Sequence, residues 1–348
     1  MTTQIAVSHT TTPFITVYPW TGAFGAKYSD PSVLPPSTGR EVVFNSTDIF
    51  VAHDSSTYLS AWPWSGGFGT RYSDPATLPT GNGIGIDYIN GYLAVAHATT
   101  PFLSVYPFTP GSGFGTKCSD PATLPTGNGN DVEFFGTTEI AVAHATTPFF
   151  SSYPFSAGTI GTKYTNPATL PTFTGNGVGF GSDYIAIAHS SSPYVSTYPF
   201  SAGVGPGTKY ANPSPTPGLG GFSATVGGTD IAVGHQSSPY ITAWPWSGGF
   251  GTKYTNPASL PAGAGNDVKF SPAVDYIANS HATTPFISVW PWSAGYGTKA
   301  SNPGTLPAST GQGVAWGSID DPAPPSSTYA NLEHGIRGLN RGLASCWN

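Results

Sequence analysis

The sequence predicts an all-β protein, built as a closed ring of seven small sheets, and three observations lead to this prediction. One motif occurs seven times, with successive copies 44 to 47 residues apart. Each copy contains stretches with the alternation of a half-buried strand and none with helical periodicity. Aromatic residues make up 14% of the chain and charged residues only 8%, with 45 glycines and 35 prolines among 348 residues. Such a composition is typical of many short strands joined by tight turns.

The histidines define the repeat. Seven of the eight histidines occupy the same place in successive copies: His9, His53, His97, His144, His189, His235 and His281. In every copy Phe or Tyr follows within five residues, and an aromatic–Pro–aromatic triplet comes next. A period of about 40 to 45 residues with four strands per copy is the signature of a β-propeller blade. We therefore expect residues 1–320 to form a single closed seven-bladed β-propeller.

The copy in residues 265–307 illustrates the expected strands. DVKFS alternates apolar and polar residues, and YIANSH and FISVWPW read as two more strands separated by the turn ATTP. GTKASNP predicts a weaker fourth strand that ends at its proline. The seven repeats are expected near 4–48, 49–92, 93–139, 140–184, 185–230, 231–276 and 277–320.

The two ends of the array predict how the ring closes. QIAVSH (4–9) corresponds to the second strand of a copy, and the first strand that should precede it is missing. An additional first strand occurs at the other end, as GVAWGSID (313–320). We expect these two segments to pair in one blade, because this pairing removes the open edge that the ring would otherwise leave.

The sequences of the repeats resemble two groups of known proteins. VKFSPAVDYIANSH (268–281), followed by FISVWPW, resembles the WD40 and YVTN-type propeller repeats. The Gly-His before the first strand and the Trp-Asp after the third are missing, so the side-chain tetrad of WD40 repeats is not carried over. The segments VAHATTPF and SDPATLPTGNG are similar to repeats of tailed-bacteriophage structural proteins. This second resemblance implies a virion component.

The seven histidines suggest a metal site, but their spacing argues against one. Zinc needs three or four ligands within about 2 Å of one point, whereas packed sheets, each with one histidine, lie about 10 Å apart. We expect each histidine to be buried and to form a hydrogen bond within its own blade, for instance to the Ser/Thr turn that follows. An exposed, pH-sensitive ring of histidines is the alternative. No metal and no cofactor are predicted.

The aromatic triplets and the basic residues each allow two interpretations. The triplets fit packing between blades, or a ring of aromatic side chains that stack on sugars. One basic residue per copy could form a ring for an acidic ligand, or could be solvated and locally paired: Lys27, Arg71, Lys117, Lys163, Lys209, Lys253 and Lys299. Three positions later stands Asp in three copies and Asn in four, so four of the cations are expected to lose their partner.

Sequence motifs argue against several function classes. Nucleophile-elbow, P-loop, His-Glu-x-x-His and EF-hand motifs are missing, and the carboxylates are scattered, mostly in turns. We therefore predict that the protein is not an enzyme. The formal net charge of −6 argues against a nucleic-acid partner. No apolar run approaches 18 residues, so no membrane insertion is expected, and no signal peptide is visible.

The array is followed by a segment of different character. Residues 321–330 read as a Pro/Ser linker, and residues 331–348 place an apolar stripe at helical spacing. We predict that this tail docks onto another protein, with a loose terminus as the alternative. The candidate contact residues are Ile336, Arg337, Leu339, Arg341, Leu343 and Trp347.

The functional prediction follows from these features together. We expect a non-enzymatic structural or attachment protein of a bacteriophage virion, such as a head decoration, tail or fibre component. Its partners would be other virion proteins, bound through the tail. The alternative is a lectin-type propeller that binds host surface glycan. A third possibility, a propeller lactonase or hydrolase, would need clustered carboxylates at the central channel, and none are evident from the repeats.

Overall fold

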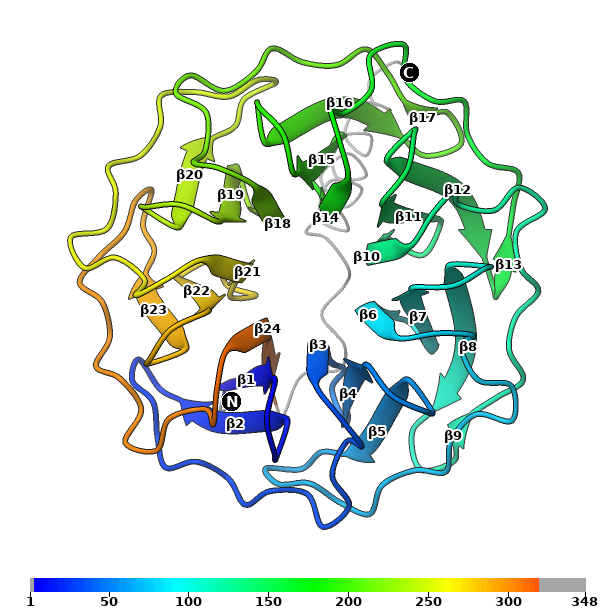
Figure 1. The fold of residues 1–348 in the computed structure, drawn as a ribbon, viewed down its shortest axis with the longest axis vertical. Coiled ribbons are helices and arrows are strands. Elements are labelled where there is room, and N and C mark those ends of the chain that lie inside the picture. Colours follow the sequence, from blue (N-terminus) through cyan, green and yellow to red (C-terminus); the bar gives the residue numbers. More distant parts are fainter. Residues whose placement is uncertain (1–2, 319–348) are drawn as a thin grey trace, which may run out of the picture.

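The computed structural model describes residues 3–318, which form seven antiparallel sheets around a central channel (Figure 1). The predicted seven-bladed β-propeller is therefore confirmed. From the channel outward, the closing blade contains β24 (Gly311–Ser318), β1 (Thr3–His9) and β2 (Ile15–Trp20). Each sequence repeat contributes the outer strands of one blade and the innermost strand of the next.

The other six blades are grouped below by their number of strands, each again written from the channel outward. Three contain three strands: β3 (Gly39–Phe44), β4 (Asp48–His53) and β5 (Leu59–Pro63); β18 (Gly221–Gly227), β19 (Asp230–His235) and β20 (Ile241–Pro245); β21 (Gly265–Phe270), β22 (Tyr276–His281) and β23 (Ile287–Pro291). Three contain four strands: β6 (Gly83–Ile89), β7 (Tyr92–His97), β8 (Leu103–Thr109) and β9 (Gly113–Phe114); β10 (Gly129–Phe135), β11 (Glu139–His144), β12 (Phe150–Ser156) and β13 (Thr159–Ile160); β14 (Gly175–Phe180), β15 (Tyr184–His189), β16 (Val195–Ser201) and β17 (Gly205–Pro206).

The fourth strand differs from the prediction. It is two residues long in three blades, and a single bridge such as Trp292↔Tyr296 replaces it in the other four. GTKASNP (297–303), the predicted fourth strand, is irregular and forms only widely spaced bonds to the third strand, from the Gly297 and Ala300 amides. The prediction of a strand at GTKASNP was wrong, because glycine and proline leave this outer segment without a continuous ladder.

The ring closes as predicted. β24 pairs with β1 in antiparallel register, from Thr3 opposite Ser318 to Ala6 opposite Ala315. β1 pairs on its other side with β2. Strands from both ends of the described chain therefore share one sheet, and no blade is left with an unpaired first strand.

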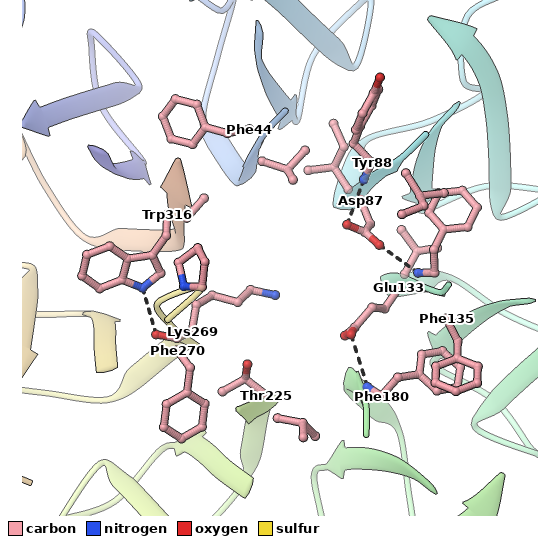
Figure 2. Close-up of a pocket in the computed structure, with 18 of the residues that line it drawn as sticks. Phe44, Asp87, Tyr88, Glu133, Phe135, Phe180, Thr225, Lys269, Phe270 and Trp316 are labelled. Carbon is pink, nitrogen blue, oxygen red and sulfur yellow. Dashed lines mark hydrogen bonds between the residues drawn. The ribbon is translucent and has the colours of Figure 1, made fainter. Parts of the chain in front are cut away.

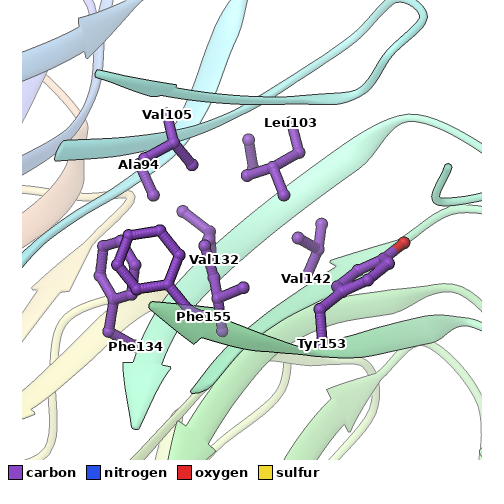
Figure 3. Close-up of a cluster of buried hydrophobic side chains, with 10 residues drawn as sticks. Ala94, Leu103, Val105, Val132, Phe134, Val142, Tyr153 and Phe155 are labelled. Atoms are coloured by element: carbon purple, nitrogen blue, oxygen red, sulfur yellow. The ribbon is translucent and has the colours of Figure 1, made fainter. Parts of the chain in front are cut away.

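The aromatic triplets pack between blades. Trp62 and Trp64 are at most 3% exposed and lie in one cluster with Ala6 and Val17 of the preceding blade. Figure 3 shows an equivalent cluster, in which Leu103 and Val105 from β8 lie on one side and Tyr153 and Phe155 from the neighbouring blade lie on the other. The packing interpretation is confirmed, and these buried rings cannot stack on a sugar. No helix in the described chain is long and apolar enough to cross a membrane.

Candidate active site in the channel

Five carboxylates gather in the central channel, on the innermost strands β3, β6, β10 and β21. Side chains of a strand alternate between its two faces, so the third and fifth residues of each inner strand belong to the same alternating set. The third positions, in blade order, are Glu41, Gly85, Asp131, Gly177, Ser223, Asp267 and Gly313, and the fifth are Val43, Asp87, Glu133, Gly179, Thr225, Lys269 and Ala315. Most of the side chains at these positions line one or both of two cavities at the channel ends.

Each of these carboxylates also joins its blade to the next one. One oxygen accepts a hydrogen bond from a backbone amide on the inner strand of the following blade: Glu41 from Ile86 at 2.7 Å, Asp87 from Phe134 at 2.8 Å, Asp131 from Val178 at 2.8 Å, Glu133 from Phe180 at 3.2 Å, and Asp267 from Val314 at 2.9 Å. Figure 2 shows two of these bonds. The free edge of each inner strand would otherwise leave such amides without a partner.

Lys269 is not needed for these links. Figure 2 shows its side chain reaching into the channel toward Asp87 and Glu133. Its Nζ lies 3.5 Å from Glu41 Oε1, and its side chain is 29% exposed. Burial would lower its pKa, but the surrounding carboxylates, led by Asp267 and Glu41, outweigh burial and hold the pKa well above its usual range. Lys269 therefore remains an ammonium group among carboxylates.

Burial raises the pKa values of the channel carboxyl groups by different amounts. It raises the pKa of Asp87 to about 6 and the pKa of Glu133 to about 8, where Asp87 and Asp131 add to the effect. Burial likewise raises the pKa of Asp131 to about 7. At neutral pH Asp87 is thus mostly ionised while Glu133 is mostly protonated. Two carboxyl groups in opposite states within one site are the arrangement that acid–base catalysis requires.

A cavity of about 500 Å³ opens where the inner strands end (Figure 2). Asp87, Glu133 and Lys269 share it with an aromatic wall that includes Phe44, Tyr88, Phe135 and Trp316. An apolar wall with a few convergent polar groups is typical of a small-molecule site. A second cavity, of about 340 Å³ and lined by Arg40, Asn130 and Asn176, lies where the inner strands begin.

The seven repeat histidines are fully buried, one per blade, as predicted. Each ring Nε2 lies 2.8 to 3.1 Å from the hydroxyl of a Ser or Thr seven residues later, on the adjacent strand. The expected hydrogen bond within the blade is therefore confirmed, with a strand hydroxyl as the partner of Nε2, and His9 Nδ1 also contacts the Thr11 carbonyl in the turn that follows. Burial lowers the pKa of each ring to about 4. In residues 3–318, no group of three or more His, Cys, Asp or Glu side chains is arranged to hold a metal ion.

The repeated basic residues are each paired locally. The hydrogen-bond partner is the Asp three residues later for Lys27, Arg71 and Lys117, and the Asn at that position for Lys163, Lys209, Lys253 and Lys299. The expectation that four cations lose their partner was wrong, because the amide Oδ1 accepts the same bond. Neither channel cavity is lined by any of the seven. The tail candidates, Ile336 to Trp347, lie outside the described residues, so docking of the tail stays a prediction.

Solved structures with the same fold place the chain among known propellers. No protein-family model matches the chain, and no curated protein matches its sequence. The periplasmic gluconolactonase of Pseudomonas aeruginosa is 13% identical, with a TM-score of 0.65 over 91% of this chain and 99% of that one. A proposed 6-phosphogluconolactonase from Bacteroides uniformis is 11% identical, with a TM-score of 0.65 over 90% and 99%. The WD40 propeller domain of Doa1 is 11% identical, with a TM-score of 0.55 over 79% and 84%.

These similarities establish the class of fold, a WD40-like seven-bladed β-propeller. They also require a correction. The prediction of a non-enzymatic bacteriophage structural protein, with a glycan-binding propeller as its alternative, was wrong, because named neighbours are lactonases and none of those named is a virion protein. The prediction that the protein is not an enzyme was wrong as well, because named neighbours are lactonases and the carboxylates that looked scattered in the sequence are gathered in the channel.

Proposed function

We propose that the protein is a hydrolase that opens the ring of small sugar lactones in the channel cavity. The observation that carries this proposal is the group formed by Asp87, Glu133 and Lys269 beside one aromatic-walled cavity. The shared fold with a gluconolactonase directs the choice of ester. Aromatic walls suit a sugar ring, since they can stack against its apolar face.

Each group has a role that its protonation state supports. Ionised Asp87 accepts a proton from water as the water oxygen attacks the lactone carbonyl carbon. The Lys269 ammonium stabilises the oxyanion of the tetrahedral intermediate. The bond between the carbonyl carbon and the ring oxygen then breaks, and protonated Glu133 donates its proton to that oxygen. The product is the open hydroxy acid, and a proton passing from Asp87 to Glu133 through water restores the starting state.

Two features go beyond what closing the ring needs. Glu133 uses Oε1 for its link to Phe180, and within the described chain Oε2 has no hydrogen-bond partner. The equivalent of Lys269 is Thr225 on β18 and Ala315 on β24, so a cation at this position is not part of the repeat. An acid with a free oxygen and an unrepeated cation are what a site added to the fold would contain.

The test is the rate at which purified protein opens D-glucono-1,5-lactone, followed by acid release above the spontaneous rate. Glu133→Gln should lower kcat by about 10²- to 10⁴-fold, and Lys269→Thr should lower it by about 10²- to 10³-fold. Asp120→Asn is the matched control, because four other blades already pair Lys with Asn at that position. The proposal fails if the wild-type rate equals the spontaneous one, or if both channel variants keep full activity.

A further inference from the structure

We infer that the channel site accepts uncharged lactones and rejects phosphorylated ones. This inference rests on the proposed function and adds the substrate class. Among the described residues that line the cavity, Lys269 is the only cation, while Glu41, Asp87 and Glu133 are carboxyl groups. A phosphate dianion would therefore find a single cation among these residues, and the carboxylate of Asp87 in the same cavity would repel it.

Lys269 is already engaged by carboxylates. Its ammonium lies 3.5 Å from Glu41, and Asp267 and Asp131 stand in the adjoining layer of the channel. Phosphate recognition in proteins usually relies on several unpaired cations or on bidentate arginine. One ammonium that is shared with carboxylates can stabilise the single oxyanion of the lactone. No further cation among the described residues of the cavity lining is then available to bind the doubly charged phosphate.

The linking carboxylates also occupy backbone amides that could otherwise bind an anion. Consecutive free N–H groups can form a concave site for phosphate. Here five amides on the free edges of the inner strands are occupied, because Ile86, Phe134, Val178, Phe180 and Val314 all donate to the linking carboxylates. The links between blades therefore make these five donors unavailable to a phosphate.

The remaining cations of residues 3–318 are elsewhere. Arg40 lines the second cavity, where Nε and Nη2 each lie 2.7 Å from a carboxylate oxygen of Asp54. The seven repeated basic residues pair with Asp or Asn outside both cavities. Thr225 occupies the position equivalent to Lys269 on the adjacent blade and also lines the first cavity. Thr225 is therefore the position where a second cation would create phosphate specificity.

The experiment compares kcat/KM for glucono-1,5-lactone and its 6-phosphate. We expect the wild type to prefer the unphosphorylated lactone by about 100-fold or more. Thr225→Lys should raise the ratio of kcat/KM for the phosphate ester to kcat/KM for the uncharged lactone by about 10-fold or more. Thr225→Gln is the control, since it adds length without charge and should leave the ratio unchanged.

The outcomes separate this inference from the proposed function. Equal use or preference of the phosphorylated lactone would overturn the inference and leave the hydrolase intact. If neither lactone is opened, the hydrolase fails. In that case, calorimetry measures the Kd of the neutral gluconolactam and the Kd of its 6-phosphate, and the two values are compared. Tighter binding of the phosphorylated lactam would overturn the inference, and tighter binding of the neutral one would support it.

Discussion

At the scale of single residues, Glu133 was missed because it differs from its counterparts. The fifth position of the inner strand carries a different residue in every blade: Val43, Asp87, Glu133, Gly179, Thr225, Lys269 and Ala315. Aligning the repeats emphasises what they share, which here is packing. The informative feature is a position that differs in every copy of an otherwise repeated strand. Three of its seven residues are charged, although charged residues are rare in the chain.

The buried histidines allow a residue-scale prediction about stability. His144→Ala should lower the free energy of unfolding by about 1 to 3 kcal/mol, because Ser151 loses its partner inside the protein. Chemical denaturation of the wild type and the variant measures the difference. Ser151→Ala should cost a similar amount, and the double variant should cost less than the sum. Full additivity would show that the two side chains do not stabilise one another.

At the scale of elements, the sequence predicted the inner three strands of each blade better than the fourth. DVKFS alternates apolar and polar residues, and YIANSH is a short run that is buried almost throughout, and both patterns are visible in a single sequence. The outermost segment packs on one side only and carries glycine and proline. Its few hydrogen bonds depend on the third strand beside it and not on an alternating pattern of its own. The conformation of GTKASNP could therefore not be predicted from the sequence.

The glycine that starts each inner strand provides a prediction about elements. A Cβ on Gly129 would lie 2.4 Å from the carbonyl oxygen of Phe102 in the preceding blade. The same approach, 2.1 to 2.4 Å, recurs at the other six: Gly39, Gly83, Gly175, Gly221, Gly265 and Gly311. Gly129→Ala should therefore lower the melting temperature by several degrees, since a backbone atom must move. Gly67→Ala, where no atom lies within 4 Å, is the control.

The Gly129 prediction has a clear contrary result. If Gly129→Ala and Gly67→Ala melt at the same temperature in calorimetry, the blades can shift apart without cost. The glycine would then be explained by the turn before the strand and not by the contact between blades.

At the scale of the whole molecule, ring closure was predictable and the channel was not. Closure follows from counting strands, because the copy at residues 4–9 lacks the strand that residues 311–318 supply. The channel combines one or two residues from each of several strands that are about 45 residues apart. No local pattern links Asp87, Glu133 and Lys269, so their meeting depends on the radial arrangement of blades.

The histidines also predict how the stability of the whole ring depends on pH. Their pKa falls from 6.5 to about 4 in the folded state, so the unfolded chain binds more protons between these values. Their contribution is complete above pH 6.5 and is lost as the pH falls toward 4. The raised carboxyl pKa values act oppositely, stabilising the fold at low pH, but seven histidines outnumber the four carboxyls with raised pKa in the channel: Glu41, Asp87, Asp131 and Glu133.

Calorimetry across this range is the measurement. The melting temperature should fall between pH 6.5 and 4, and the fall should be smaller in His144→Gln, which lacks one titrating ring. A melting temperature that is constant or rises on acidification would mean that the histidines are already protonated in the fold, contrary to their burial.

The pH dependence of lactone opening tests the central claim most directly. With Asp87 as base and Glu133 as acid, kcat/KM for glucono-1,5-lactone should follow a bell with limbs near pH 6 and pH 8. Glu133→Gln should lower the maximum and remove the alkaline limb, while Asp120→Asn should reproduce the wild-type curve. A rate that follows the spontaneous reaction at every pH, or an alkaline limb that persists in Glu133→Gln, would contradict an acid–base site in the channel.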